Sequence, residues 1–201
     1  MSDQAPSLSA AVTGGLRLHL GCGPHPIDGY INVDKFGTPD VLWDLEVTPW
    51  PWEDNSVDEV VMEHVLEHLG QSPAVFFAII RELYRVCRSE ATIRIVTPHP
   101  RHDSFLNDPT HVRPVTPEML GLFSKRLNRQ WAAGNYANST LALYLDVDFE
   151  ITRLTIHLDE PWHSKLANRE ISADQVTQEI QRFNNVAREF HIEWKVIKKE
   201  T

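Results

Sequence analysis

Residues 16–34 read LRLHLGCGPHPIDGYINVD, and this stretch decides the fold. An alternating apolar strand at 16–20 runs directly into a glycine turn at 21–23, and a second short strand at 31–33 ends at Asp34. Glycine lets a backbone approach a ligand closely because it has no Cβ. A carboxylate at the end of the neighbouring strand can accept hydrogen bonds from both hydroxyls of a ribose. The stretch therefore predicts half of a nucleoside pocket at the carboxyl edge of a parallel sheet.

The composition predicts one globular domain. The chain has 201 residues, of which 42% are hydrophobic and 23% charged, and this is enough for one substantial core. We expect a flexible N-terminal tail at 1–15 and a single domain at 16–201. Cys22 and Cys87 form no disulfide framework, which favours a reducing cytoplasm.

Several partners are disfavoured by the same composition. No apolar run reaches about 18 residues, so no membrane span is expected, and the first residues lack the basic and apolar regions of a signal peptide. The formal charge of −9 argues against a nucleic acid or an anionic membrane, because phosphate binding needs clustered Lys and Arg.

Strand and helix patterns alternate and predict an α/β fold. The expected strands lie at 16–20, 31–34, 41–43, 58–62, 91–97, 147–157 and 190–198. The expected helices lie at 64–70, 73–87, 117–127 and 173–188. These elements indicate a Rossmann-like, mostly parallel sheet, with the last two strands pairing antiparallel at one edge.

The first half of the sheet should have reduced crossover helices. Only residues 24–30 join the first two strands and only 35–40 join the next two, whereas a parallel crossover normally needs a dozen residues or more. One sheet face would then need another cover. We expect the 173–188 helix, the N-terminal tail or a second subunit there, and the last option would make the protein a homodimer.

Four segments in a fixed order carry a family resemblance: LHLGCG at 18–23, INVD at 31–34, WDLEVTPWPWEDNSVDEV at 43–60 and EHVLEHL at 63–69. The chain resembles a class I S-adenosylmethionine-dependent methyltransferase, and more narrowly the small type 11-like enzymes associated with cell-surface glycan pathways. The resemblance implies methyl transfer from S-adenosylmethionine to a small-molecule or glycan acceptor. Residues 16–98 would be the cofactor half, and 99–201 would hold the acceptor loop and the C-terminal part.

The resemblance also implies a set of cofactor-binding residues. The backbone of Gly21, Cys22 and Gly23 would wrap the methionine part, Asp34 would take the ribose hydroxyls, Asp44 and the N–H of Leu45 would bind adenine, and Glu63 and His64 would lie beside the methionine end. Carboxylates and neutral dipoles suit a sulfonium cation better than Lys or Arg would. His19 stands where the common motif has an acid.

The loop at 99–114 is the candidate acceptor site because it follows the fifth strand at the same sheet edge. Methyl transfer to a hydroxyl or an amine needs a base, and histidine suits that task. We assign the base or acceptor-orienting role to His111, with His99 or His102 as second candidates. Alternatively, 108–110 is a turn that only holds the loop together. We assign no metal, because the spacing matches no standard motif.

Two nearby features favour packing over chemistry. The segment from His64 to His68 reads HVLEH, which is not the His-Glu-x-x-His pattern of metalloproteases. We therefore expect His64 near the cofactor and His68 at the surface or in packing. Trp50 and Trp52 could form a substrate wall, but such residues more often close a core edge.

Two other function classes remain open at this point. A nicotinamide-dependent oxidoreductase is disfavoured, because Pro26 replaces the third glycine of the dinucleotide fingerprint and Asp34 comes too soon after Gly23. A non-catalytic cofactor-binding or interaction protein would keep the pocket without the acceptor chemistry.

Overall fold

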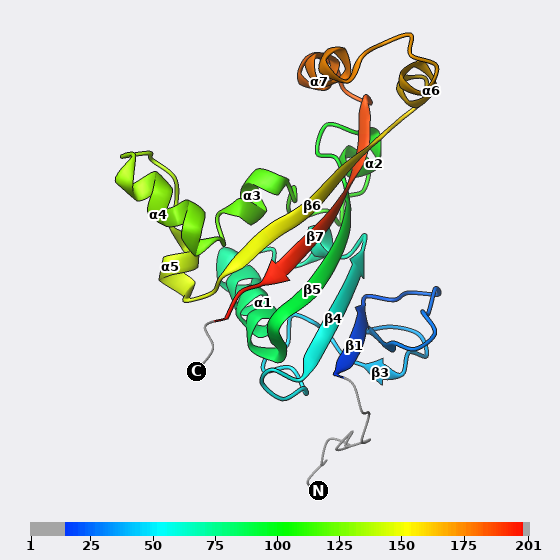
Figure 1. Ribbon diagram of the computed structural model, residues 1–201. Helices are drawn as coiled ribbons and strands as arrows, with labels where there is room; N and C mark the ends of the chain where they lie inside the picture. The colour runs from blue at the N-terminus through cyan, green and yellow to red at the C-terminus, as the bar shows by residue number, and fades with distance from the viewer. Residues whose placement is uncertain (1–14, 199–201) are drawn as a thin grey trace, which may run out of the picture.

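The computed structural model describes residues 15–198 (Figure 1). Its elements are β1 (Leu16–Leu20), β2 (Ile31–Asp34), β3 (Val41–Leu42), β4 (Val57–Glu63), the 3₁₀ turn η1 (Leu66–His68), α1 (Pro73–Val86), β5 (Cys87–Pro98), α2 (Asp103–Leu106), α3 (Pro117–Gly121), α4 (Lys125–Ala133), α5 (Leu141–Leu145), β6 (Phe149–Leu158), α6 (Trp162–Ala167), α7 (Ala173–Arg182) and β7 (Ala187–Val196). The tail predicted at 1–15 lies outside the described residues except for Gly15, whose N–H donates to Asp58 Oδ2 at 2.9 Å.

All seven strands form one sheet in the order β3-β2-β1-β4-β5-β7-β6. Strand β7 runs antiparallel to both β5 and β6, and the other pairings are parallel. The predicted α/β fold with a mostly parallel sheet is confirmed, and so is the antiparallel pairing of the last two strands. The antiparallel strand itself lies one position in from the edge, because β6 takes the outer place.

The first half of the sheet lacks crossover helices, as predicted. Residues 24–30 and 35–40 connect β1 to β2 and β2 to β3 through turns and bends alone. Three helix predictions need correction. Only the 3₁₀ turn η1 forms within 64–70, because His64 has a left-handed backbone with φ of 54°. The helix predicted at 117–127 is two helices, because Ser124 leaves helical geometry and caps α4.

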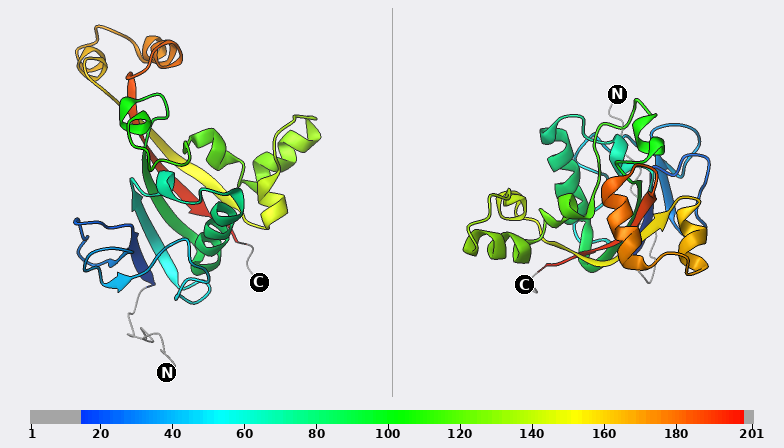
Figure 2. Two further views of the ribbon diagram at one scale, coloured as in Figure 1. Left: turned by 180° about the vertical axis from the view of Figure 1, so that it is seen from behind. Right: turned by 90° about the horizontal axis from the view of Figure 1, so that it is seen from above.

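The helix predicted at 173–188 ends at Arg182, and β7 begins five residues later at Ala187. Its start is as expected, because Ser172 and Gln175 form a reciprocal capping box. Helix α7 lies with α6 at the tip of the β6–β7 hairpin, far from β1 to β3 (Figures 1 and 2). The proposal that this helix covers the first half of the sheet is therefore wrong.

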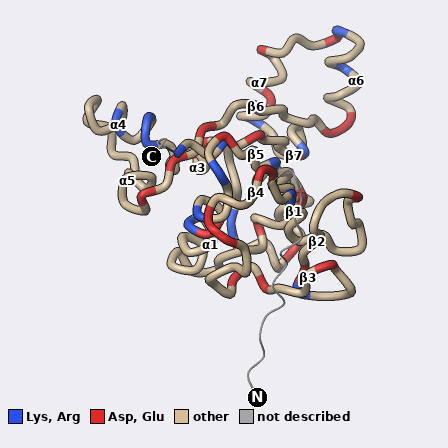
Figure 3. The backbone as a smooth tube through the Cα atoms, turned by 60° about the horizontal axis from the view of Figure 1, so that its bottom comes forward, with Lys and Arg blue, Asp and Glu red and all other residues tan. Residues whose placement is uncertain are grey.

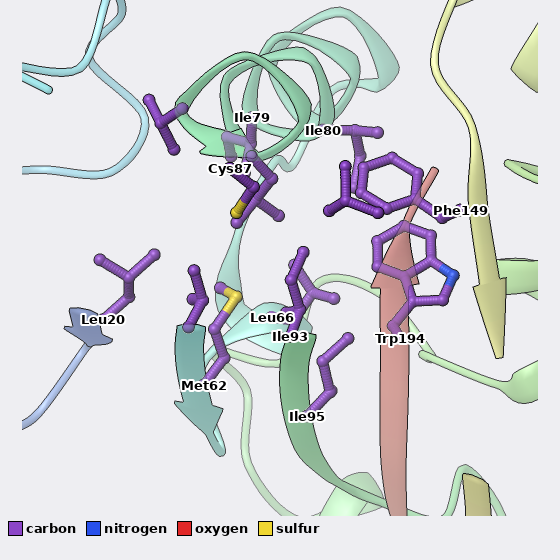
Figure 4. Close-up of a cluster of buried hydrophobic side chains, with 14 of the residues drawn as sticks. Leu20, Met62, Leu66, Ile79, Ile80, Cys87, Ile93, Ile95, Phe149 and Trp194 are labelled. Atoms are coloured by element: carbon purple, nitrogen blue, oxygen red, sulfur yellow. The ribbon is translucent and has the colours of Figure 1, made fainter. Parts of the chain in front are cut away.

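The core lies on one face of the sheet, under α1 and α3. Ser72 caps α1 and Pro73 begins it, so the helix starts where its apolar stripe can face the strands. Figure 4 shows that stripe, with Ile79 and Ile80, against Ile93 of β5 and Trp194 of β7. Burying each large aliphatic side chain contributes about 1.5–3 kcal/mol, so this layer holds the sheet and the helix together.

The opposite face of the sheet is charged. Arg94 pairs with Glu59 at 2.7 Å across β5 and β4, and Arg17 lies over the ring of Tyr30 at 5.0 Å. Lys and Arg of β5 and β7 occur beside Asp and Glu of β4, β5 and β7 (Figure 3). A face of this kind can lie in water without a cover. The homodimer expected from a bare sheet face therefore stays a prediction.

Replacing Trp194 with alanine is expected to destabilise the fold by about 3–5 kcal/mol, because a large buried ring leaves a cavity. Trp194 is fully buried and stacks on Phe149 with ring centroids 3.9 Å apart. Urea unfolding followed by circular dichroism would measure the change. Tyr144→Ala on α5 is the control, because Tyr144 is exposed. It should cost roughly 0.5 kcal/mol, as surface substitutions do. Equal costs for the two variants would contradict the assignment.

Within residues 15–198, every helix is too short or too polar to traverse a lipid bilayer.

Candidate functional site

The strands β1, β2, β3 and β4 end at one edge of the sheet, and the glycine turn after β1 closes against β2. The N–H groups of Gly21 and Cys22 both donate to the carbonyl of Val33, at 2.7 and 3.1 Å. Gly21 and Gly23 adopt φ of 69° and 51°, which L residues other than glycine rarely adopt. The turn therefore holds its backbone at the edge where ligands of open α/β sheets bind.

Asp34 is held in place by the turn that it faces. Its Oδ2 accepts from the N–H of Gly23 at 2.8 Å, and its Oδ1 accepts from the N–H of Phe36 at 2.9 Å. A carboxylate has about four acceptor positions, so each oxygen can accept one hydrogen bond more. The carboxylate is thus oriented by the protein and still able to bind a pair of hydroxyls.

A buried amide organises the two connections that lack helices. Asn32 Oδ1 accepts from the N–H of Ile27 at 2.7 Å and lies 3.1 Å from His19 Nδ1. Its Nδ2 donates to Asp40 Oδ2 at 2.9 Å, and its own N–H donates to the same oxygen at 2.8 Å. These bonds lower the pKa of Asp40. Sequence reasoning missed this network, which fixes the loops on both sides of Asp34.

A cavity of about 180 Å³ opens beside this turn. It brings together five of the predicted cofactor residues: Gly21, Asp34, Asp44, Leu45 and His64. The remaining lining residues are Lys35, Trp43, Val65, His68 and Leu69.

Three further predicted residues adjoin the cavity without lining it. Gly23 donates to Asp34, and Cys22 is buried behind the turn, where burial raises the pKa of its thiol. Glu63 is exposed at the end of β4.

Asp44 and Leu45 form the far wall of the cavity. Asp44 Oδ1 accepts from the N–H of Glu46 at 3.0 Å, and Lys35 Nζ lies 4.0 Å from its Oδ2. The carbonyl of Leu45 accepts from Trp50 Nε1 at 3.0 Å, while its N–H has no acceptor within residues 15–198. Trp50 and Trp52 are buried, so their predicted packing role is confirmed. This wall offers one acceptor and one donor side by side.

His64 follows β4 and lies between two carboxylates. Its Nδ1 is 3.5 Å from Glu67 Oε1, and its Nε2 is 3.5 Å from Glu189 Oε2. The neighbouring Glu67 carboxylate raises the pKa of His64, against the opposing effect of burial. His64 therefore joins the cavity to the buried residue Glu67.

The first half of the 99–114 loop is tied to the far hairpin. His99 is buried, its Nδ1 accepts from the N–H of Arg101 at 3.2 Å, and burial lowers its pKa. His102 caps α2 by accepting from the N–H of Ser104, and its Nε2 lies 3.0 Å from Asp159 Oδ2. Both histidines thus make structural contacts away from the cavity.

The second half of the loop returns to η1. The N–H groups of Val112 and Arg113 donate to the carbonyl of Glu67, at 2.9 and 3.2 Å. The ring of His111 lies 4.5 Å from that of His68, which lines the cavity. His68 packs against His111, as expected, and it also lines the cavity, which the sequence did not indicate.

The predicted turn at 108–110 is confirmed. Asp108 Oδ1 accepts from both the N–H and the Oγ1 of Thr110, at 2.8 and 2.6 Å. These hydrogen bonds lower the pKa of Asp108. The two interpretations of this loop are compatible, because the turn at 108–110 places His111, the candidate base, beside η1.

A larger cavity of about 600 Å³ lies elsewhere, between α3, α4 and β6. Met119, Trp131 and Trp194 contribute to its walls. It contains none of the residues predicted from the sequence, and it lies away from the carboxyl ends of β1 to β4.

Residues 35–95, which include β3, Asp44, His64 and η1, match the family model of a methyltransferase domain of type 11. The matched segment is part of a methyltransferase domain. The predicted enzyme class is thereby confirmed. No curated protein matches the sequence.

Solved structures agree with the methyltransferase domain in fold. An S-adenosylmethionine-dependent methyltransferase from Archaeoglobus fulgidus has a TM-score of 0.55 and 22% identity, over 90% of this chain and 86% of that one. A proposed S-adenosylmethionine-dependent methyltransferase from Listeria monocytogenes has a TM-score of 0.50 and 14% identity, over 92% of each chain. At these identities the likeness establishes the shared fold.

The two glycines of the methyltransferase turn should respond differently to alanine. A Cβ at Gly21 would lie 2.4 Å from Cγ2 of Val65, so Gly21→Ala adds a clash to backbone strain and should cost roughly 2–4 kcal/mol of stability. A Cβ at Gly23 would meet no protein atom within 4 Å, so Gly23→Ala should cost only about 1–2 kcal/mol. Thermal unfolding of both variants would test this order, and a larger loss for Gly23→Ala would contradict it.

Proposed function

We propose that the cavity beside Gly21, Asp34 and Asp44 binds S-adenosylmethionine, and that the methyl group passes to a small-molecule or glycan acceptor held by the 105–113 part of the loop. The methyl donor is S-adenosylmethionine, the cofactor of the enzyme class to which the domain belongs. The observation that carries the proposal is the convergence of five predicted cofactor residues on one cavity.

The residues present fit this cofactor. Asp34 has free acceptor positions for two ribose hydroxyls, and Asp44 Oδ2 beside the free N–H of Leu45 suits the amino group and ring nitrogen of adenine. The open space at Gly23 leaves room for a ligand against the backbone. A volume of about 180 Å³ is below the roughly 300 Å³ of typical pockets, so part of the cofactor would extend along this turn.

The chemistry divides between cofactor and protein. When bound, S-adenosylmethionine supplies a methyl carbon made electrophilic by its sulfonium. The protein has to align the acceptor and remove its proton. His111 suits the second task, because its Nδ1 lies 2.8 Å from the carbonyl of Phe105 and must carry the hydrogen, which leaves the lone pair on Nε2.

The proposed acceptor class and compartment rest on the net charge, the family resemblance and the state of the cysteines. The net charge of −9 disfavours polyanionic acceptors, and the glycan option comes from the family resemblance. Cys22 and Cys87 are both free and buried, and we propose a cytoplasmic location on that basis.

Ligand-induced stabilisation tests the proposal first. A ligand that binds only the native state raises the unfolding temperature, so S-adenosylhomocysteine should raise it and NAD should not. Stabilisation by NAD alone would favour the oxidoreductase reading.

Transfer of a radiolabelled methyl group to a panel of metabolites and glycans should then yield a labelled product. Cofactor binding without transfer to any of them would instead favour a non-catalytic binding protein.

A further inference from the structure

Three side chains beside the cavity form a cluster, and the proposed methyl transfer does not require them to lie together. Glu67, His68 and His111 each place one potential ligand atom within 4.8 Å of the others. We propose that these three residues bind a divalent transition-metal ion, with Zn²⁺ as the best match. The proposal does not depend on the identity of the methyl acceptor or on methyl transfer.

The strongest observation is the state of Glu67. Its side chain is fully buried, and neither carboxylate oxygen has a hydrogen-bond partner within residues 15–198. A buried carboxylate without partners is costly, and natural proteins pair such groups or use them to coordinate metals. His64 Nδ1 lies 3.5 Å from Oε1, at the limit of hydrogen-bond distance, and approaches the carboxylate from that side only. A cation between Glu67 and the two histidines would complete the pairing.

The two histidines are oriented as metal ligands. His111 Nδ1 lies 2.8 Å from the Phe105 carbonyl, which can only accept, so this nitrogen carries the hydrogen and Nε2 carries the lone pair. His68 Nδ1 lies 2.9 Å from Thr110 Oγ1, which itself donates to Asp108 Oδ1 at 2.6 Å. Thr110 Oγ1 therefore accepts from His68, so the lone pair of His68 is on Nε2. His111 Nε2 lies 3.9 Å from Asp108 Oδ2, which is beyond hydrogen-bond distance.

Such partners on the second ring nitrogen are typical of metal-binding histidines. Metal ligands usually donate their other N–H to a carbonyl or a hydrogen-bonded group, which fixes the tautomer and the ring orientation. Here a carbonyl holds His111, and a hydroxyl backed by a carboxylate holds His68. The arrangement is preorganised, because the N–H of Val112 pairs with the carbonyl of Glu67 and joins the two segments.

The donor set identifies the class of ion. Two imidazoles and one carboxylate are the ligands of catalytic Zn²⁺ sites, which keep a further position for water or substrate. The same set also binds Fe²⁺ with open positions. Ca²⁺ and Mg²⁺ prefer oxygen ligands, so they fit poorly. His68 also lines the cavity, so an ion held here would lie at its wall.

A second cluster provides a contrast. His157, Glu189 and His191 also lie within metal-binding distance of one another. Here, however, the carboxylate has a hydrogen bond, since Glu189 Oε1 lies 2.8 Å from His191 Nε2. His157 is exposed and stacks on His191. This cluster needs no ion to balance it, and it supplies a matched control.

When a metal ion is bound at this cluster, His111 is a metal ligand and cannot act as the catalytic base. Metal binding and proton acceptance use the same Nε2 lone pair, so one molecule cannot do both at once. The proposed methyl transfer can fail while the metal site stands, and the reverse also holds. The test therefore reads metal binding directly.

The experiment is a calorimetric titration of the full chain with Zn²⁺ after removal of bound metal by EDTA and dialysis. Wild type should bind one equivalent, and Co²⁺ in place of Zn²⁺ should give the visible absorption bands of a low-coordinate nitrogen–oxygen site. His111→Ala and the isosteric Glu67→Gln each remove a ligand, so each should weaken Zn²⁺ binding by at least the roughly 10- to 100-fold that loss of an outer-shell partner costs. His191→Ala should bind as wild type does.

Three results would overturn the proposal: no binding of Zn²⁺ or Co²⁺ by wild type, unchanged affinity in both cluster variants, or loss of binding in His191→Ala alone. Retention of the Co²⁺ spectrum in His191→Ala assigns the ion away from the second cluster, even where a variant of the first cluster fails to fold. Circular dichroism in EDTA identifies such a variant.

Discussion

Replacing Asp34 with alanine is expected to weaken S-adenosylhomocysteine binding by about 100-fold or more. A hydrogen bond to a charged group contributes about 1.5–3 kcal/mol, and each 1.4 kcal/mol is a factor of ten in affinity. The proposed site asks Asp34 to accept from two ribose hydroxyls. The same change also removes the acceptor of the Gly23 N–H, which holds the turn against the ligand.

Isothermal calorimetry of the Asp34→Ala protein would measure this loss. Asp28→Ala is the control, because Asp28 is an exposed carboxylate on the same connection and lies outside the cavity lining. Its affinity should stay at the wild-type value. Equal affinities for the two variants would remove Asp34 from the ribose role. A loss in both would indicate a general electrostatic effect of negative charge.

Replacing His111 with alanine should lower kcat by about 10²- to 10⁴-fold, the usual contribution of a general base. Affinity for S-adenosylhomocysteine should change little, because His111 contacts His68 and does not itself line the cavity. Turnover is best measured in EDTA, so that the imidazole is free to accept a proton. This split between catalysis and binding separates a catalytic role from a collapse of the loop.

His163→Ala serves as the control for this variant, since that histidine is exposed on α6 and far from η1. It should keep full turnover. An active His111→Ala protein would end the assignment of the base. A variant that loses cofactor affinity together with turnover would show instead that His111 acts by holding η1 in place.

The cofactor half of the site was predictable from the sequence because its signals are local. The glycine turn, Asp34 and Asp44 each follow a short strand, and parallel strands end at the same edge of a sheet. Spacing along the chain therefore translates directly into proximity. The absence of crossover helices was also readable, because 24–30 and 35–40 are too short to contain them.

The rest of the site depends on contacts between distant segments. His68 and His111 are 43 residues apart, and backbone hydrogen bonds to Glu67 bring them together. The amide of Asn32 likewise organises two loops, and the pattern of strand residues gave no sign of it. A sequence motif describes residues that are close along the chain. Neither arrangement could therefore be predicted from motifs.

The charged face of the sheet did have a signal in the sequence. Residues 16–20 read Leu-Arg-Leu-His-Leu, and 92–96 place Arg94 between Ile93 and Ile95. Such alternation is typical of a strand with one buried face and one face in water. The short connections between β1, β2 and β3 suggested that one sheet face lacks covering helices. The alternation of apolar and polar residues already indicated that this face can lie in water.

The central claim is that the carboxyl ends of β1, β2 and β3 hold the adenosyl group. A crystal structure of the protein soaked with S-adenosylhomocysteine tests it most directly. We predict the ribose hydroxyls on the Asp34 carboxylate and adenine beside Asp44 and Leu45. Density for the ligand in the 600 Å³ cavity near Trp131 and Trp194, with the turn at 21–23 empty, would contradict the account.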